Sequence, residues 1–333
     1  MKLTLELTTN LPNLQSLLES DLSPYQSLYL GHPYCADYRG NLLDQPDDLR
    51  EAVDRLRQQG KRVYLCTPAA PKTREFDRVR RVLEMGAALG VDAVETHNLG
   101  VVRILNRECP GLPIHTGVFA NVYTDAGAVR LREYGVRRVT PNHELSLEEI
   151  DRLAAASGLE VEILAHGKMP LGITDACYLL QHRRASGLDC PDLCREELWL
   201  RRRDWVLKPI GQVMLSGQDV CLLEHLPELL RKGYAAFRVE ALTESPAYRS
   251  RAGQIYADAL SRAAERPAAT KLADWLGRLP DWLAELRAHS AHGLCNGYYF
   301  ARSGRDYVSR AEAQVGMQGP PGVAGPSDLL DEG

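Results

Sequence analysis

Three cysteines that lie close together in the chain are the residues best suited to chemistry. Cys177, Cys190 and Cys194 fall within one segment, and the last two form a CxxxC step. Cysteines at this density are typical of a disulfide, a zinc site or an iron–sulfur cluster. Three is an odd number for a disulfide framework, and it is one short of the four thiolates that zinc or a 4Fe-4S cluster usually takes. The spacing therefore predicts a metal centre whose fourth ligand comes from elsewhere in the chain.

The fourth ligand has two candidates. Cys35 ends the segment Gly-His-Pro-Tyr-Cys directly after a predicted strand, which places it on the same face as the other three cysteines. Cys295, in Cys-Asn-Gly-Tyr near the end of the chain, is the alternative. Spacing alone leaves zinc and iron–sulfur open. No histidine stands at zinc-finger spacing near Cys190, and thiolates that come from distant segments favour iron–sulfur.

The elements that must position these cysteines follow a regular alternation. Short apolar runs are each followed by a polar turn and an amphipathic helix, which is the pattern of a parallel sheet. The expected strands are residues 3–7, 27–30, 62–66, 93–96, 113–118, 138–140, 160–165 and 234–239. Eight repeats predict an α/β fold of the closed (β/α)8, TIM-barrel-like type. A doubly wound open sheet is the alternative.

The alternation is broken once, between the seventh and eighth strands. An insertion of residues 167–221 carries the three cysteines, and residues 166–170 are expected to turn out of the strand. Loops after the carboxyl ends of barrel strands build active sites, so the insertion is expected on the functional face. We expect one barrel domain over residues 1–300, including two C-terminal helices, and an extension over 301–333 whose Pro/Gly-rich end is disordered.

Polar side chains gather just past the predicted strand ends. They are Thr67, Glu95, His97, Asn98, His115, Asn121, Asn142, His143, Glu144, His166, Arg238 and Glu240. They predict a polar pocket at the barrel mouth, although loop polarity and helix capping would explain many of them. His166 is a candidate for proton transfer. Arg238 and Glu240 are two residues apart and point to the same face, so they predict either a carboxylate-binding pair or an ion pair.

Composition limits the function classes. The chain has 333 residues, of which 44% are hydrophobic and 25% charged, with a net charge of −4. This is ordinary globular composition, with no general attraction to nucleic acid and one local basic run at Arg201-Arg202-Arg203. The chain shows no signal-peptide pattern and no apolar run near ~18 residues, so we expect a cytoplasmic protein with reduced thiols. A His-Glu-x-x-His motif is absent, and no cysteine has a protease signature.

Several segments resemble the family of peptidase U32 proteins, over most of the chain up to about residue 300. They are Val-Glu-Thr-His-Asn-Leu-Gly (94–100), the step from Val139 to Ile150 that contains Glu-Leu-Ser-Leu-Glu-Glu-Ile, and Phe-Arg-Val-Glu (237–240). Tyr-Leu-Gly-His-Pro-Tyr-Cys (29–35), the cysteine spacing after His-Gly-Lys-Met-Pro-Leu (166–171) and Cys-Asn-Gly-Tyr (295–298) are similar to the UbiV branch, which acts in oxygen-independent ubiquinone biosynthesis.

This resemblance implies a 4Fe-4S cluster on Cys35, Cys177, Cys190 and Cys194. It also implies oxygen-independent hydroxylation of a small aromatic ubiquinone precursor, with prephenate as oxygen donor, in a heterodimer with a second, UbiU-like U32 protein. Other members of the family hydroxylate tRNA or ribosomal RNA, and Arg183, Arg184 and the 201–203 run would then line a basic groove. A peptidase and a non-catalytic partner with a structural metal are the remaining alternatives.

Overall fold

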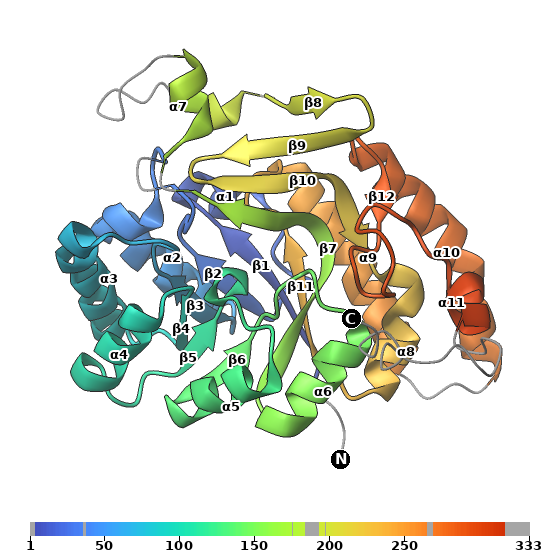
Figure 1. Cartoon of the computed structure of the whole chain (residues 1–333), viewed down its shortest axis with the longest axis horizontal. Helices are drawn as coiled ribbons and strands as arrows, with labels where there is room; N and C mark the ends of the chain where they lie inside the picture. Colours follow the sequence, from blue (N-terminus) through green and yellow to red (C-terminus); the bar gives the residue numbers. More distant parts are fainter. Residues whose placement is uncertain are drawn as a thin grey trace, which may run out of the picture.

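A closed barrel of eight parallel strands forms the centre of the molecule (Figure 1). The computed structural model describes residues 4–35, 38–174, 176–183, 193–196, 198–264 and 269–316. The barrel strands are β1 (Glu6–Leu11), β2 (Ser27–Leu30), β3 (Arg62–Cys66), β4 (Ala93–Thr96), β5 (Ile114–Thr116), β6 (Val136–Val139), β7 (Glu160–Ile173) and β11 (Ala236–Glu240). Each pairs in parallel with the next, and β11 pairs with both β1 and β7. The predicted (β/α)8 fold is confirmed, and the open sheet is wrong.

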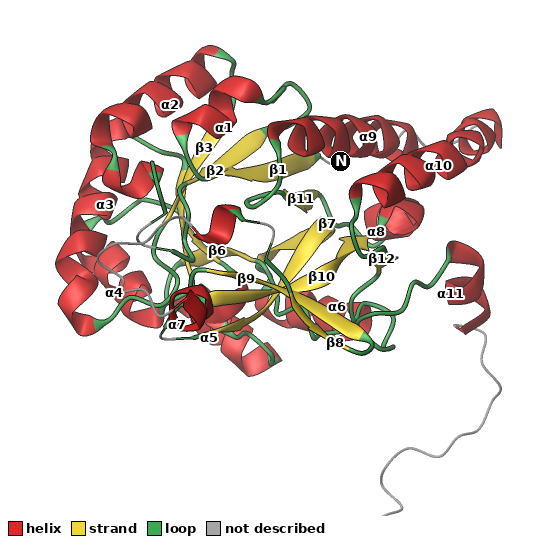
Figure 2. Ribbon diagram, turned by 90° about the horizontal axis from the view of Figure 1, so that it is seen from above, coloured by secondary structure: helices red, strands yellow, loops and turns green. Residues whose placement is uncertain are grey.

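Helices cover the outside of the barrel (Figure 2). They are α1 (Leu14–Glu19), α2 (Pro46–Gln58), α3 (Phe76–Leu89), α4 (Leu99–Glu108), α5 (Asp125–Glu133), α6 (Leu147–Ser157), α8 (Leu226–Arg231) and α9 (Pro246–Ala264). Their apolar stripes face the strands, as in α2, where Leu49, Val53 and Leu56 are fully buried. Ser146 and Glu149 form the predicted capping box at the start of α6. The main hydrophobic core therefore lies between the barrel and its helices.

The seventh strand is much longer than expected. Residues 166–170 continue β7 instead of turning, so the predicted turn is wrong. They pair antiparallel with β10 (Val213–Cys221), which pairs with β9 (Trp205–Ile210) and then β8 (Leu200–Arg202). Pro170, which has no N–H to donate, lies where the pairing with β10 shifts register. The insertion thus forms an antiparallel sheet that extends one barrel strand, at the top of Figure 1.

The turn between β9 and β10 is seated on the loop after β2. Gly211 has φ +53°, and a Cβ there would lie 2.4 Å from the Tyr34 carbonyl oxygen and 2.7 Å from the Cys35 Cβ. The Gln212 N–H donates to that same carbonyl at 3.0 Å. Glycine is required at this position both by the left-handed backbone and by the close approach.

A second apolar cluster closes the carboxyl end of the barrel. It joins the hairpin to the loops after strands β2, β3 and β11, through Tyr34, Ala69, Ile210, Val213, Leu215 and Leu242. Phe119, in the loop after β5, packs against it. The insertion therefore covers the barrel mouth, where an open pocket was expected.

The ends of the chain complete the structure. Strand β1 begins three residues later than predicted, and residues 1–3 lie outside the described part. The insertion also contains α7 (Tyr178–Arg183). The C-terminal segment contains α10 (Ala269–His289), β12 (Leu294–Cys295) and α11 (Arg310–Gly316). Residues after 300 still pack on the barrel, where the Val308 carbonyl lies 2.9 Å from His225 Nε2. The predicted disordered tail lies outside the described residues. No described helix is both long and apolar enough to span a membrane.

Candidate functional site

The loop after β2 presents the first predicted ligand, Cys35. The side chain of Asn41 holds this loop, because its oxygen accepts the His32 N–H at 2.9 Å. Its amide donates to the carbonyls of His32 at 3.1 Å and Cys35 at 3.2 Å. These three bonds fix the backbone around Cys35, whose side chain is half-buried. Nothing in the sequence singled out Asn41.

The insertion presents two further ligands. Cys177 lies between the end of β7 and α7, and its carbonyl accepts the N–H of Gln181 at 3.2 Å. The Thr174 N–H donates to the Gln212 carbonyl at 2.7 Å, which ties the end of β7 to the hairpin turn. Cys194 lies in the 3₁₀ turn η5 (Leu193–Arg195). Cys190 lies outside the described residues.

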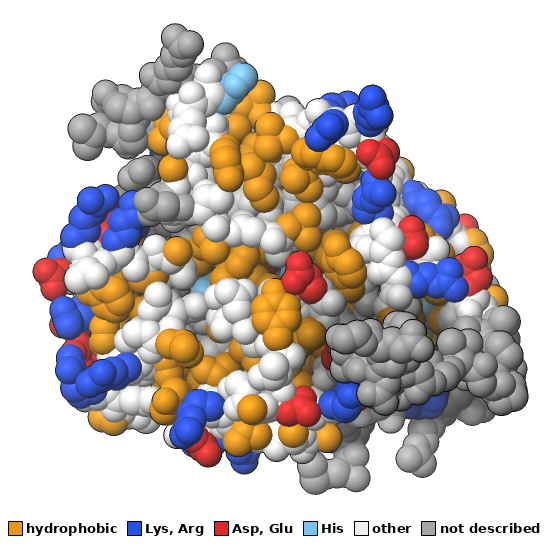
Figure 3. Space-filling model, in the orientation of Figure 1, with side chains coloured by type: hydrophobic (Ala, Val, Ile, Leu, Met, Phe, Trp, Pro, Cys, Tyr) orange, Lys and Arg blue, Asp and Glu red, His pale blue; other side chains and the backbone are white. Residues whose placement is uncertain are grey.

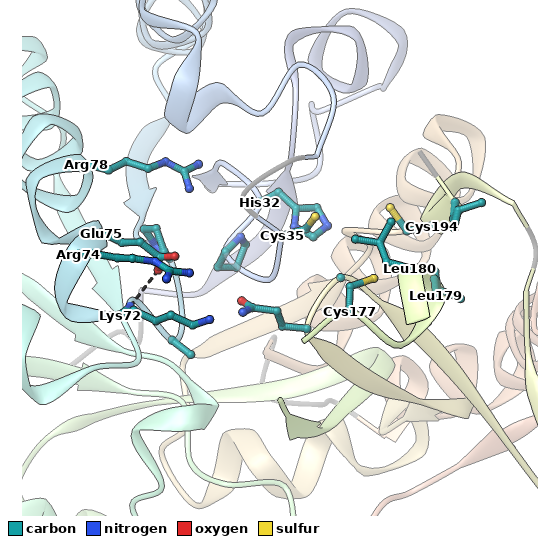
Figure 4. A pocket seen from close by; sticks show the side chains of 16 residues that line it. His32, Cys35, Lys72, Arg74, Glu75, Arg78, Cys177, Leu179, Leu180 and Cys194 are labelled. Atoms are coloured by element: carbon teal, nitrogen blue, oxygen red, sulfur yellow. Dashed lines mark hydrogen bonds between the residues drawn. The ribbon is translucent and has the colours of Figure 1, made fainter. Parts of the chain in front are cut away.

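Cys35, Cys177 and Cys194 line one cavity of about 290 Å³ beside the hairpin turn (Figure 4). The described cysteines are all free thiols. Three of the four predicted ligands, one from the loop after β2 and two from the insertion, therefore line the same cavity. Cys295, the alternative fourth ligand, is absent from the cavity lining: it is buried in β12, and burial raises the pKa of its thiol to about 12.

These residues fit a 4Fe-4S cluster. Thiolates are the ligands such clusters take, and half-buried cysteines at a cavity wall are accessible for cluster insertion. Within the described part of the chain, no three Cys, His, Asp or Glu side chains are placed to hold one metal ion. A single zinc would draw its sulfurs to about 2.3 Å from one point, whereas a cubane binds each thiolate through a different iron. The three thiols therefore match the donors of either an iron–sulfur cluster or a zinc site.

The barrel interior below the cavity is filled by buried charges. Arg238 donates through Nε to Glu162 at 2.8 Å and through Nη2 to Glu95, and its guanidinium lies over the Tyr29 ring at 4.0 Å. Burial alone would raise the pKa of Glu95, but Arg238 outweighs it and lowers that pKa below its usual range. Arg238 is therefore held by Glu95 and Glu162, whereas the predicted ion pair was with Glu240.

Glu240 lies two residues further along β11, near the barrel mouth. One oxygen accepts the Leu242 N–H at 3.2 Å, and the side chain is almost fully buried. Burial raises the pKa of Glu240 to about 7, against which Arg238 acts only in part. A carboxyl that titrates near neutrality can both donate and accept a proton. Arg238 and Glu240 are thus neighbours on β11, but Arg238 is ion-paired with two other carboxylates, whereas Glu240 has a pKa near neutrality.

The other polar residues at the strand ends do not form an open pocket. Thr67, Glu95, His97, His115, His143 and Glu240 are buried beneath the apolar cluster. Burial lowers the pKa of His97 to about 4 and of His143 to about 3, so both imidazoles are neutral. Asn98 caps α4, and Glu144 accepts a hydrogen bond from Tyr123 at 2.7 Å. Capping and loop polarity therefore account for the latter two.

His166 lies in a separate place, on the helix side of β7. Its ring stacks on Tyr248 of α9, with Nε2 at 2.9 Å from the Tyr248 hydroxyl. Burial lowers the pKa of His166 to about 4. The same tyrosine hydroxyl lies 3.4 Å from Asp219, which is paired with Lys168 at 2.7 Å. The structure does not bring His166 together with the cysteine cavity or with Arg238 and Glu240.

Cationic side chains on the cavity wall opposite the cysteines are a feature that sequence reasoning missed. Lys72, Arg74 and Arg78 surround the start of α3, on the loop after β3 (Figure 4). Loops after barrel strands usually build the site, so the position of these residues after β3 could have marked them as candidates.

The structure defines a class: a (β/α)8 barrel that carries a cysteine-lined cavity on its covered carboxyl end. The chain belongs to peptidase family U32, which it matches over residues 24–309.

Three relatives illustrate the range of the family. The chain is 26% identical to an uncharacterized protease of Methanocaldococcus jannaschii, over 82% of this chain and 66% of that one. It is 24% identical to tRNA hydroxylation protein P of Escherichia coli, over 75% and 66%. It is 22% identical to the 23S rRNA 5-hydroxycytidine synthase of Escherichia coli, over 69% and 35%. The chain thus spans at most about two thirds of these relatives' lengths.

Proposed function

We propose that this chain is an iron–sulfur protein of oxygen-independent hydroxylation. It would hold a 4Fe-4S cluster with Cys35, Cys177, Cys190 and Cys194. The observation that carries the proposal is that three of these cysteines, one from the loop after β2 and two from the insertion, line one cavity at the carboxyl end of the barrel. Two of the relatives described above have names of hydroxylation enzymes or proteins, which supports the reaction class.

A cluster held by four cysteines has no open iron position, so it would supply one-electron transfer. The chain's own residues would hold the ligands in position, exclude water and exchange a proton. The bonds of Asn41 keep Cys35 in place, and the Gly211 turn keeps the insertion against it. The apolar cluster around Tyr34 keeps water from the barrel charges beneath. Glu240, with a pKa of about 7, is the described group best suited to exchange a proton near the barrel mouth.

We propose a ubiquinone precursor as the substrate, prephenate as the oxygen donor and a second U32 protein as the partner, in the cytoplasm. The cysteine spacing supports the assignment to this branch. A partner surface is available on the insertion, where Leu171, Tyr178, Leu200 and Trp205 are each 37–42% exposed. Figure 3 shows apolar side chains gathered over this sheet. Contiguous apolar surface of this kind is typical of protein interfaces.

RNA hydroxylation is the second candidate, because two relatives are named for RNA substrates. It would use the exposed arginines of β8, Arg201 and Arg202, whereas Arg184 and the side chain of Arg183 lie outside the described residues. On the face in Figure 3, Lys and Arg side chains lie scattered near the margins. RNA affinity that falls steeply with salt would support this candidate, and a flat salt dependence would count against it.

Peptidase activity through the barrel thiols has no support. Cys66 is fully buried with its thiol 3.7 Å from Glu95, and burial raises its pKa well above the ordinary value. Burial also raises the pKa of Cys221 to about 11. A cysteine nucleophile needs the opposite, a lowered pKa. A non-catalytic role with a structural metal is tested by whether removing the metal unfolds the protein.

The deciding experiment measures iron and acid-labile sulfide in anaerobically purified protein. We expect about four irons and four sulfides per chain, with the visible absorption of a cluster. Cys194→Ser and Cys190→Ser should each lose them, while Cys109→Ser, a half-buried thiol at the end of α4, should keep them. Full iron content in both ligand variants would refute the proposal. Cluster-loaded protein would then be assayed anaerobically, with its partner, for hydroxylation of the quinone precursor and of RNA.

A further inference from the structure

A buried histidine lines the cysteine cavity and has no part in the function proposed above. His32 lies in the loop after β2, three residues before Cys35, and its side chain is among those that line the cavity (Figure 4). It is 1% exposed, and neither of its ring nitrogens has a hydrogen-bond partner among the described residues. Buried polar groups are nearly always hydrogen-bonded, so a histidine with both nitrogens unpartnered calls for an explanation.

Two other buried imidazoles in the described part of the chain are hydrogen-bonded within the fold. His97 Nδ1 accepts the Phe119 N–H at 3.1 Å, and His166 Nε2 lies 2.9 Å from the Tyr248 hydroxyl. Each of these rings has one nitrogen engaged, whereas His32 has none. The partner of His32 is therefore best sought in the cavity that it lines.

The ring of His32 is held in place by its neighbours. It stacks on the Tyr38 ring with centroids 4.3 Å apart and planes 18° from parallel, and it lies nearly perpendicular to the Tyr34 ring at 6.1 Å. The Asn41 amide donates to the carbonyls of His32 at 3.1 Å and Cys35 at 3.2 Å, so one side chain fixes the backbone of both residues. The histidine and the predicted ligand are thus presented to the cavity by the same bonded loop.

The lining limits what this ring can bind. An imidazole carries at least one N–H donor in either of its protonation states. The wall formed by the β2 loop and the insertion offers it the sulfurs of the cysteines as acceptors. The one carboxylate among the lining residues, Glu75, lies on the opposite wall, where it accepts the Lys72 backbone N–H at 2.9 Å (Figure 4). Hydrogen bonds to the sulfurs of iron–sulfur centres are one of the factors that set their reduction potentials.

We propose that His32 donates a ring N–H to a sulfur of the metal centre in this cavity and thereby raises the reduction potential of that centre. The inference rests on the proposed function, because only an iron–sulfur cluster would give this bond a redox consequence. Reduction adds one negative charge to the centre, and a donor at its sulfurs stabilises the more negative state. The bond would also give the buried ring the partner that the described fold does not supply.

Anaerobic redox titration of the full chain, followed by electron paramagnetic resonance of the reduced state, tests this role. His32→Phe keeps a planar ring against Tyr38 and removes both nitrogens. It should retain about four irons per chain. At a fixed potential, the ratio of reduced to oxidised protein should fall about tenfold, which is about 59 mV for one electron. His182→Phe, at an exposed histidine of α7 that is absent from the cavity lining, is the matched control and should titrate as the wild type does.

His32→Asn and His32→Gln separate the hydrogen bond from the packing of the ring. Their amide N–H groups lie near the positions of imidazole Nδ1 and Nε2, respectively. One of them should therefore recover at least part of the lost potential, and it would identify the donating nitrogen. A fall in potential that neither amide recovers would show that packing sets the potential, and it would overturn the inference.

Iron content, measured on every sample, distinguishes the remaining outcomes. Full iron with an unchanged potential in His32→Phe would refute this inference and leave the proposed function standing. Loss of iron from all three His32 variants would also refute it, because His32 would then be a ligand or a structural support of the site. Iron-free wild-type protein would refute the proposed function and this inference together, since the donor would have no cluster sulfur to bind.

Discussion

Replacing Glu240 with glutamine should stabilise the protein at neutral and alkaline pH. The carboxyl is almost fully buried, and its pKa is raised from 4.5 to about 7 by burial. A difference of this size corresponds to about 3 kcal/mol of destabilisation once the folded group is forced to ionise. Glutamine has nearly the same shape and can accept the Leu242 N–H through its amide oxygen. It would remove the ionisation without removing the hydrogen bond.

The sign follows from proton binding. Between about pH 4.5 and 7 the unfolded chain loses the proton while the folded protein keeps it, so wild-type stability falls as pH rises. Below about 4.5 both states are protonated and this term vanishes. The variant has no such slope. The difference in free energy of unfolding between variant and wild type should therefore grow from near zero at about pH 4.5 to about 3 kcal/mol in favour of the variant at about pH 8.

Urea unfolding of both proteins, followed by circular dichroism at matched metal content, measures that difference. Glu148→Gln, which removes a largely exposed carboxyl from α6, controls for the loss of one charge. A difference that stays constant within about 0.5 kcal/mol across this pH range would refute the reasoning. It would mean that folding does not raise the pKa of Glu240, and that its assignment as a proton-exchanging group is wrong.

Three other substitutions test the arrangement of the barrel and the insertion. Arg238→Met should lower the free energy of unfolding by about 3–5 kcal/mol, because it leaves two buried carboxylates without their partner, and urea unfolding would show it. Gly211→Ala should lower iron content by displacing the Cys35 loop, whereas Gly172→Ala, where a Cβ meets nothing within 4 Å, should not. Tyr248→Phe should cost about 1–3 kcal/mol, since it leaves a buried histidine nitrogen without its partner; an unchanged urea midpoint would contradict this.

The regular part of the fold was predictable because its signal is local. Strands β2, β3 and β4 have the predicted bounds, since each is a short buried run between polar turns. Strand β1 (Glu6–Leu11) was placed too early because the residues in its second half, Thr8 to Asn10, are polar. Those side chains are buried in the barrel, where Thr8 bonds Glu162 at 2.8 Å, and alternation of apolar residues cannot reveal a polar interior.

The site was predictable only in part. Cysteine spacing indicated which segments supply thiols, because thiol chemistry restricts the possible roles. The covered barrel mouth was not predictable, because Gly167 and Pro170 read as a turn until β10 supplies a pairing partner about fifty residues later. The engagement of Arg238 by Glu95 and Glu162 also depends on three strands meeting inside the barrel. Such contacts are set by topology and leave no mark on neighbouring residues in the sequence.

Strand β7 runs continuously from the barrel to the cysteine loop, so its length sets the distance between them. Each strand residue adds about 3.3 Å and alternates the side on which its side chain lies. Two residues inserted after Met169 would raise the loop by about 6.6 Å with its orientation kept, whereas one residue would turn it to the opposite side. A change in the length of β7 that keeps the orientation of the loop therefore comes in steps of two residues, whereas the length of the loop itself carries no such constraint.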